Sequence, residues 1–397
     1  MVTLTTAENA LKTLYLGVIS DQLNTKTNPL FNKISQSTAD VWGKDVKKLL
    51  PIGINGGIGA GDESGLLPSA AQNTYLTLTS TLKNLFGSIE LSDKAIRASA
   101  NNAGAFVNLL NAEMEGLLKA SKFNFGRMLY GDGSGKLANI TAAVSSQSQI
   151  TLDSTKNVIE GMVIDAYNNP TTPSIISSLA GARIVSINRA NNTVVLDKQF
   201  SSGTFVFGTN SYFLTVQNSL NREITGLAAI FDNDTIYGYN RSAAYYLQPV
   251  KKAMEASEEL TDIKIQTVID QLEEHYGSEV DFIVCSAGVK RAYQSYLASF
   301  RSNVDYMDLS GGYKAISFNG IPVVSDRFAP KGTMFLLNTK EFVLHQLCDW
   351  RWLEGEDGKV IKQIPGKPVY NATLVKYAEL ICDKLAGQGR ITNITEC

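Results

Sequence analysis

Two strand-like segments with a glycine-rich stretch between them restrict what this chain can fold into. Residues 46–54 are strand-like, and residues 75–79 alternate apolar and polar side chains with the period of two of a β-strand. Glycine recurs through residues 53–65, which favours a loop tip. The pattern predicts a long, projecting hairpin. Because an isolated two-stranded ribbon is only marginally stable in water, we expect this hairpin to lie against another surface.

Two helices are predicted on either side of this hairpin. Residues 1–30 form an arm with one apolar face, which ends before Asn28-Pro29 because proline disfavours a helix at the preceding residue. Ser92-Asp93 opens a longer helix that ends near Gly126 or Gly131 and measures roughly 30 Å at ~1.5 Å per residue. Its apolar or small residues recur at steps of three and four: Ile96, Ala100, Ala103, Val107, Leu110, Met114 and Leu117.

The second half of the chain changes character twice. Residues 148–216 are rich in Ser, Thr, Asn and short β-branched runs, with a turn at Asn191-Asn192, and predict a small all-β insertion. From residue 226 the pattern becomes α/β: a helix over 261–276, a buried strand over 281–285 and a hairpin turning at Asn319-Gly320. Residues 369–382 then return across the molecule. The order of elements indicates an α+β fold with several lobes.

Charge, cysteines and hydropathy exclude several classes of protein. The 397 residues carry 36 Lys and Arg against 38 Asp and Glu, so the overall balance supplies no basic surface for tight nucleic-acid binding. The four cysteines form no CxxC pair. No segment has the pattern of a signal peptide, and no apolar run approaches the ~20 residues of a membrane span, so we expect a protein made and used without a membrane.

No motif in the sequence predicts catalysis, a cofactor or a metal. The loop 131–137 lacks both the first glycine and the Ser or Thr of a phosphate-binding loop, and it is no GxSxG elbow. His275 and His345 stand outside any ligand pattern, and Cys285 lies in an apolar strand that would raise its pKa. Residues 232–234 are read as a polar turn rather than a cation site, and the tyrosines of 237–246 as packing rather than base stacking.

Four stretches, taken in order, resemble the major capsid proteins of tailed bacteriophages, which have the HK-ninety-seven-like fold. They are residues 130–135 after the long helix, 224–232 at the entry to the α/β lobe, 318–326 with its Phe-Asn-Gly-Ile-Pro-Val hairpin, and 340–352 with its tryptophans. Together with the arm and the hairpin, the resemblance covers nearly the whole chain.

The resemblance implies a division of the chain. Residues 1–43 would be an N-terminal arm, 44–91 the extended E-loop, 92–147 the peripheral domain with its spine helix, 148–216 a β-rich insertion domain, 217–372 the axial domain and 373–397 a C-terminal return segment. Contacts between subunits are expected at the E-loop tip and along the arm. The residues expected there are Gly56, Gly57, Gly59, Gly61, Asp62, Glu63, Leu66 and Leu67 in the tip and Leu11, Leu14 and Val18 in the arm.

The resemblance also implies partners and a location. Members of this family form hexamers and pentamers of one chain, which tile an icosahedral shell around packaged double-stranded DNA without binding it specifically. The other implied partners are a portal protein, a separate scaffolding protein, since only about 40 residues precede the hairpin, and a decoration protein. The chain would reside in the virion after assembly in the cytoplasm of the host bacterium. No asparagine stands out as a partner for the lysines near the hairpin, so no cross-link between subunits is expected.

Three other interpretations remain open at this point. An encapsulin-like cellular nanocompartment would keep the fold and enclose enzymes instead of DNA, although the β insertion and long hairpin favour a virus. An enzyme acting on polysaccharides or nucleotides would need a catalytic constellation that no motif predicts. A tail or fibre protein would show internal repeats, and none is visible.

Overall fold

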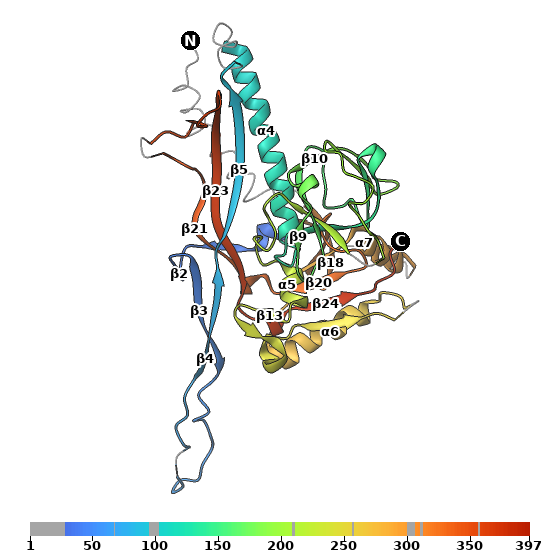
Figure 1. The fold of residues 1–397 in the computed structure, drawn as a ribbon. Coiled ribbons are helices and arrows are strands. Elements are labelled where there is room, and N and C mark those ends of the chain that lie inside the picture. Colours follow the sequence, from blue (N-terminus) through green and yellow to red (C-terminus); the bar gives the residue numbers. More distant parts are fainter. Residues whose placement is uncertain are drawn as a thin grey trace.

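The strands and helices of the computed structural model gather around three groups of buried apolar side chains. The largest group extends from the long sheet and the spine helix into the lobe that holds the C-terminus, the second lies within that lobe, and the third fills a barrel. Figure 1 shows the strands and helices of these parts. The structure describes residues 28–66, 68–94, 103–208, 211–255, 258–299, 306–309, 313–355 and 358–397. Within these ranges, no helix is both long enough and apolar enough to span a membrane.

The predicted hairpin is present and extends away from the rest of the chain (Figure 1). Its strands are β3 (Asp45–Gly53) and β4 (Thr74–Thr81), which pair antiparallel along their whole length. The short strand β2 (Val41–Trp42) pairs with the base of β3. The described residues between β3 and β4 are irregular, so the tip of the hairpin is a long loop.

A second sheet runs along the length of the molecule. Its longest strand, β23 (Val369–Cys382), lies between β5 (Lys83–Ser92) and β21 (Phe342–Trp352) and is antiparallel to both. The short strand β1 (Ser35–Ser37) extends the sheet beside β21, and β22 (Lys362–Gln363) pairs with β23. Figure 1 shows β5 leading upward from the root of the hairpin, so this sheet and the hairpin share one continuous stretch of chain.

The predicted spine helix lies against this sheet. Helix α4 (Ala103–Met128) is about 40 Å long at ~1.5 Å per residue, and it runs beside β5 (Figure 1). A Cβ added to Gly87 of β5 would lie 2.7 Å from Cδ1 of Leu117 on the helix, so strand and helix are in close contact. Residues 95–102, which include Ile96 and Ala100 of the predicted apolar stripe, lie outside the described residues.

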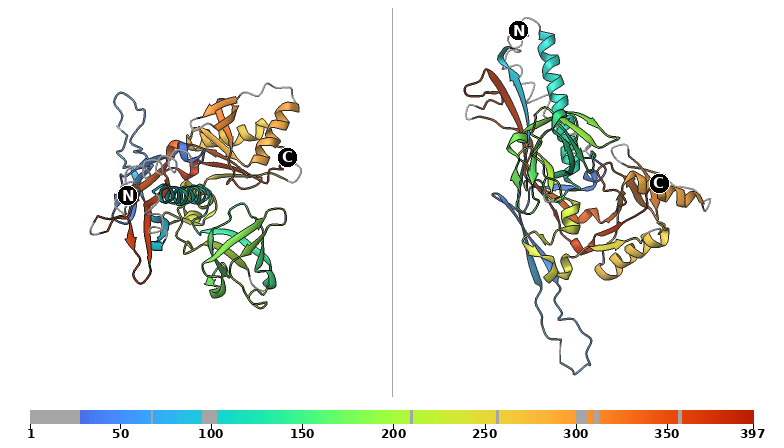
Figure 2. Two further views of the ribbon diagram at one scale, coloured as in Figure 1. Left: turned by 90° about the horizontal axis from the view of Figure 1, so that it is seen from above. Right: turned by 45° about the vertical axis from the view of Figure 1, so that its right-hand side comes forward.

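The β-rich insertion is a closed barrel with its own core. Each of its six main strands pairs with two others, and the circle closes where β10 pairs with β8. Closure leaves no free edge among these six strands. The strands are β6 (Lys136–Val144), β7 (Gln149–Leu152), β8 (Val163–Asn168), β10 (Ala182–Asn188), β11 (Thr193–Leu196) and β12 (Tyr212–Val216), with β9 (Ser174–Ile175) attached to β8. Figure 2 shows the barrel standing to one side of the spine helix.

The α/β lobe contains a seven-stranded sheet. Its order is β15 (Val250–Ala253), β24 (Gly389–Thr392), β20 (Met334–Leu337), β16 (Phe282–Cys285), β19 (Ile321–Ser325), β18 (Tyr313–Phe318) and β17 (Tyr306–Leu309). The predicted hairpin turn joins β18 to β19, and both Asn319 and Gly320 have positive φ angles, of 48° and 81°, as a type I′ turn requires. Helices α6 (Asp262–Tyr276) and α7 (Ala287–Ser299) pack against strands of this sheet.

Short elements connect these units. Helix α5 (Leu227–Asp232) leads into the α/β lobe and is followed by the two-stranded ribbon of β13 (Thr235–Ile236) and β14 (Tyr239–Asn240). Single 3-10 turns occur at η2 (Phe31–Lys33), η3 (Ser145–Gln147), η4 (Ser177–Leu179), η5 (Arg241–Ala243), η6 (Tyr245–Leu247), η7 (Thr339–Glu341) and η8 (Leu385–Gly387).

Three segments of the predicted division differ from the sheets that the structure shows. The barrel begins with β6 at residue 136 rather than at 148, because β6 closes the barrel between β7 and β12 and buries Leu137 and Ile140 in its core. The predicted axial segment 217–372 includes β21, which pairs in the long sheet instead. The predicted C-terminal return segment, residues 373–397, is also divided between two sheets. Strand β23 belongs to the long sheet, and β24 belongs to the seven-stranded sheet of the α/β lobe.

Candidate subunit interface

The root of the hairpin is anchored in the body of the protein. Val46, Leu76 and Leu78 are buried in the central core, as the alternation of the strands predicts. The ribbon that follows α5 holds β4 in place: the amide of Thr79 donates to the carbonyl of Tyr237 at 3.2 Å. This root is therefore part of the folded subunit, and only the outer part of the hairpin projects.

Further polar contacts fix the direction in which the hairpin leaves the body. The hydroxyl of Tyr239 donates to the carbonyl of Thr77 at 3.1 Å. Lys48 on β3 pairs with Asp383, which follows the last residue of β23. These contacts come from the α/β lobe side and from the long sheet, so both units hold the hairpin root.

The tip of the hairpin is held together by one asparagine. Oδ1 of Asn55 accepts hydrogen bonds from the amide of Gly57 at 2.9 Å and from the amide of Ala71, on the opposite side of the loop, at 3.2 Å. The two sides approach so closely that a Cβ on Gly57 would lie 3.2 Å from the carbonyl oxygen of Ser69. Glycine at this position permits the close approach, which any side chain would hinder.

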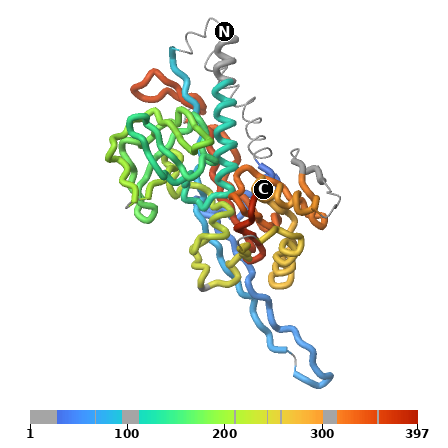
Figure 3. The backbone as a smooth tube through the Cα atoms, turned by 90° about the vertical axis from the view of Figure 1, so that its right-hand side faces the viewer, coloured from blue at the N-terminus to red at the C-terminus, as the bar shows by residue number. Residues whose placement is uncertain are grey.

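Large apolar side chains line the tip without cover from the chain itself. Ile54 is 86% exposed, Ile58 85% and Leu66 98%, and Leu49 and Tyr75 on the strands are also more than half exposed. Figure 3 shows this part of the hairpin standing clear of the rest of the molecule. Contiguous exposed apolar side chains are typical of surfaces that bind another protein. The structure thus presents a ribbon with exposed apolar side chains and a buried, hydrogen-bonded root.

The structure places seven of the eight predicted tip residues together in this loop, namely Gly56, Gly57, Gly59, Gly61, Asp62, Glu63 and Leu66. The eighth, Leu67, and the predicted arm residues Leu11, Leu14 and Val18 lie outside the described residues. The prediction included the exposed Leu66 and missed Ile54 and Ile58, which are almost as exposed. The spacing of large apolar residues between glycines was the signal that would have identified them.

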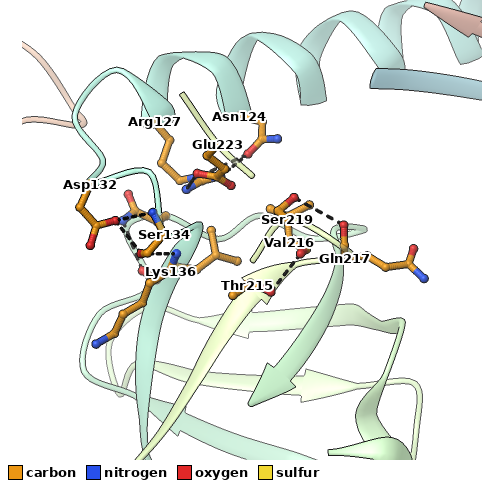
Figure 4. A network of polar contacts seen from close by, with 12 residues as sticks. Asn124, Arg127, Asp132, Ser134, Lys136, Thr215, Val216, Gln217, Ser219 and Glu223 are labelled. Carbon is orange, nitrogen blue, oxygen red and sulfur yellow. Dashed lines mark hydrogen bonds and ion pairs between the residues drawn. The ribbon is translucent and has the colours of Figure 1, made fainter. Parts of the chain in front are cut away.

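The junction between the barrel and the spine helix rests on a buried ion pair. Arg127 of α4 donates to both carboxylate oxygens of Glu223, at 2.9 and 2.5 Å, and both side chains are almost fully buried (Figure 4). Nη2 of Arg127 also donates to Asn124 at 2.6 Å. Because Glu223 lies in the segment that follows β12, this pair ties the exit of the barrel to the helix.

The loop that enters the barrel is a compact turn. Asp132 accepts hydrogen bonds from the amide of Ser134 at 2.9 Å and from its hydroxyl at 2.5 Å (Figure 4). Gly135 has a φ angle of 81°, and a Cβ there would lie 2.5 Å from the carbonyl oxygen of Ser219. Gly135 therefore permits a tight turn between α4 and β6 that lies close to the segment leaving the barrel.

Cys285 and His345, the residues considered as a nucleophile and a metal ligand, are both buried inside the folded protein. Cys285 is fully buried, and burial raises the pKa of its thiol to about 12, which suits a core residue and not a nucleophile. His345 is buried, with Nδ1 3.0 Å from the carbonyl oxygen of Ala39. In the described part of the chain, no three His, Cys, Asp or Glu side chains come together as metal ligands would.

Comparison with solved structures reveals similar folds at low sequence identity. A chain of the cyanophage A-1(L) capsid matches with a TM-score of 0.55 and 12% identity over 92% of this chain and 91% of that chain. An encapsulin of Synechococcus elongatus gives a TM-score of 0.48 with 9% identity, over 93% and 89% of the two chains. No family model and no curated protein matches the sequence. The cyanophage match spans nearly all of both chains, so they share a fold.

Proposed function

We propose that this chain, which has the HK-ninety-seven-like fold, is a structural subunit of an icosahedral phage head. The observation that carries the proposal is the apolar, projecting hairpin on that fold. Full burial of an Ile or Leu side chain stabilises by about 1.5–3 kcal/mol, so covering Ile54, Ile58 and Leu66 would contribute several kcal/mol to association. A neighbouring copy of the same chain supplies such cover in every subunit of a closed ring.

The expected assembly consists of hexamers and pentamers that close into a shell around double-stranded DNA. Near-balanced charge supports enclosure without tight binding, because a strongly basic inner wall would hold DNA through its phosphates. A portal protein, a separate scaffolding protein and a decoration protein are the further partners of this proposal. The shell would assemble in the host cytoplasm and persist in the virion, and the proposal assigns the chain no catalytic step.

Variants of the hairpin tip test this proposal. Replacing Ile58 and Leu66 together with Asp should abolish shells in electron micrographs while the circular dichroism spectrum of the subunit stays unchanged, because neither side chain contributes to its core. The matched control replaces both residues with Val, which keeps the surface apolar and should still assemble. Normal shells from the double Asp variant would show that the tip is not an interface.

Deletion of residues 53–65 tests the same surface more severely. The root strands remain anchored through Val46 and Leu78, so the shortened subunit should fold and stay unassembled. Loss of the folded spectrum would instead make the tip part of the subunit core. Nuclease-resistant DNA within purified wild-type particles supports a phage head, whereas particles filled with protein cargo contradict it.

A further inference from the structure

Glu379 is a fully buried acidic side chain in the middle of β23. Oε1 accepts hydrogen bonds from the amide of Thr225 at 2.7 Å and from the amide of Leu380 at 3.2 Å. Oε2 is buried and has no hydrogen-bond partner among the described residues. Burial raises the pKa of this carboxyl to about 7, so the protein holds a proton here that an exposed glutamate would release.

The position of Glu379 joins several parts of the molecule. It stands opposite His345 of β21, and its neighbour Ala378 stands opposite Lys83, the first residue of β5. The residue before Lys83, Leu82, belongs to the hairpin root, because its amide donates to the carbonyl of Lys44 at 2.8 Å. One carboxyl group therefore lies where the hairpin root meets the long sheet.

Thr225, at the entry to the α/β lobe, is in contact with Glu379 through its amide. It immediately precedes Gly226, where the chain enters α5. Gly226 lies so close to the end of the spine helix that a Cβ would be 2.3 Å from the carbonyl oxygen of Met128. The bond from Thr225 to Glu379 therefore connects the lobe entry, the helix end and the long sheet.

Charged and titratable groups surround Glu379 without neutralising it. Lys83 on β5 lowers its pKa, but less than burial raises it. His345 on β21 is directed to Ala39 through Nδ1, and its Nε2 is buried without a partner among the described residues. Asp383, which follows the last residue of β23, pairs with Lys48. The hydroxyl of Tyr237 is hydrogen-bonded to the backbone of β23. Lys83 acts on Glu379 only as a nearby charge, and among the described residues no lysine, arginine or histidine forms an ion pair with an ionised Glu379.

We propose that the contact between Thr225 and Glu379 is a joint between the α/β lobe and the long sheet, and that protonation of Glu379 controls whether this joint is closed. With the carboxyl neutral, the joint is closed around Thr225; with the carboxylate ionised, it opens and admits water, because a buried charge without a cation is costly. The proposal concerns the single chain and does not depend on shell assembly.

Hydrogen exchange of the purified chain tests the joint. A carboxyl that titrates at about 7 when closed and at 4.5 when open should raise the open population about tenfold between pH 6 and pH 8.5. Peptides covering residues 225–232 should lose protection by this factor after correction for intrinsic exchange. Glu379→Gln keeps an oxygen to accept from Thr225 but cannot ionise, so its protection should not change with pH. Glu90→Gln, on the exposed face of β5, is the control and should behave as wild type.

A second measurement keeps the test decisive if Glu379→Gln does not fold. Infrared difference spectra of the wild-type chain should show the carbonyl stretch of a protonated carboxylic acid disappearing near pH 7. Constant protection of residues 225–232 in the wild type from pH 6 to 8.5 would overturn the proposal. An equal loss of protection in Glu379→Gln and wild type would overturn it as well.

Discussion

The hydroxyl of Tyr237 donates a hydrogen bond to the carbonyl oxygen of Leu380 at 3.0 Å. The same hydroxyl accepts from the amide of Cys382 at 3.2 Å, while the carbonyl of Tyr237 accepts from Thr79 in the hairpin. One residue thus connects the ribbon after α5, the hairpin root and the longest strand of the molecule.

Tyr237→Phe should lower the free energy of unfolding by about 1–3 kcal/mol, because it leaves the buried carbonyl of Leu380 and the amide of Cys382 without the hydroxyl. Urea denaturation followed by circular dichroism measures the change. Tyr245→Phe is the matched control, since Tyr245 is largely exposed and its substitution should have little effect. Equal effects of the two changes would show that the Tyr237 hydroxyl does not stabilise the root.

Gly226→Ala should destabilise the protein by more than about 4 kcal/mol or prevent folding. A Cβ at Gly226 would lie 2.3 Å from the carbonyl oxygen of Met128 and 2.7 Å from that of Leu129. Gly116→Ala offers a contrast within α4, because its Cβ meets nothing within 4 Å and alanine favours a helix by up to about 1 kcal/mol. In thermal unfolding, Gly226→Ala should therefore have a lower melting temperature than wild type, and Gly116→Ala a higher one.

Arg127→Met should cost about 3–5 kcal/mol, because Glu223 would remain buried without its cation. Denaturant titration of the purified variant gives this value. The comparison is Lys340→Gln, which breaks a largely exposed pair with Glu279 and should cost less than about 1 kcal/mol. A small effect at Arg127 would mean that the barrel junction does not depend on the ion pair.

Thiol labelling at pH 8 should distinguish the cysteines of the native subunit. Because burial raises the pKa of Cys285 to about 12, its thiolate is scarce at pH 8, and the side chain is also inaccessible. Exposed Cys397 should react first with iodoacetamide, and Cys285 only after denaturation. Mass spectrometry of the labelled peptides checks the order. Rapid labelling of native Cys285 would contradict its place in the core.

Local signals in the sequence predicted the elements that depend on local residues. The hairpin turn at Asn319-Gly320 follows from two residues that accept positive φ angles, and the end of α6 follows from Gly277, whose φ angle is 55°. The glycine-rich tip was likewise visible, because two alternating strands enclose it. These features need no knowledge of the rest of the fold.

Features that depend on distant residues could not be predicted in this way. The barrel closes through pairing of β10 with β8, and nothing within β6 marks it as a barrel strand rather than an extension of the spine region. β21 and β20 are separated by only a few residues but belong to different sheets. Glu379 reads as one of many glutamates until Thr225, 154 positions away, is placed against it.

If this chain builds a closed shell, as we propose, negative-stain electron microscopy of the purified wild-type chain over a range of concentrations will show it most directly. We expect rings of five and six subunits and closed, icosahedral particles. A folded chain that remains monomeric at every concentration, in micrographs and in sedimentation, would contradict the proposal.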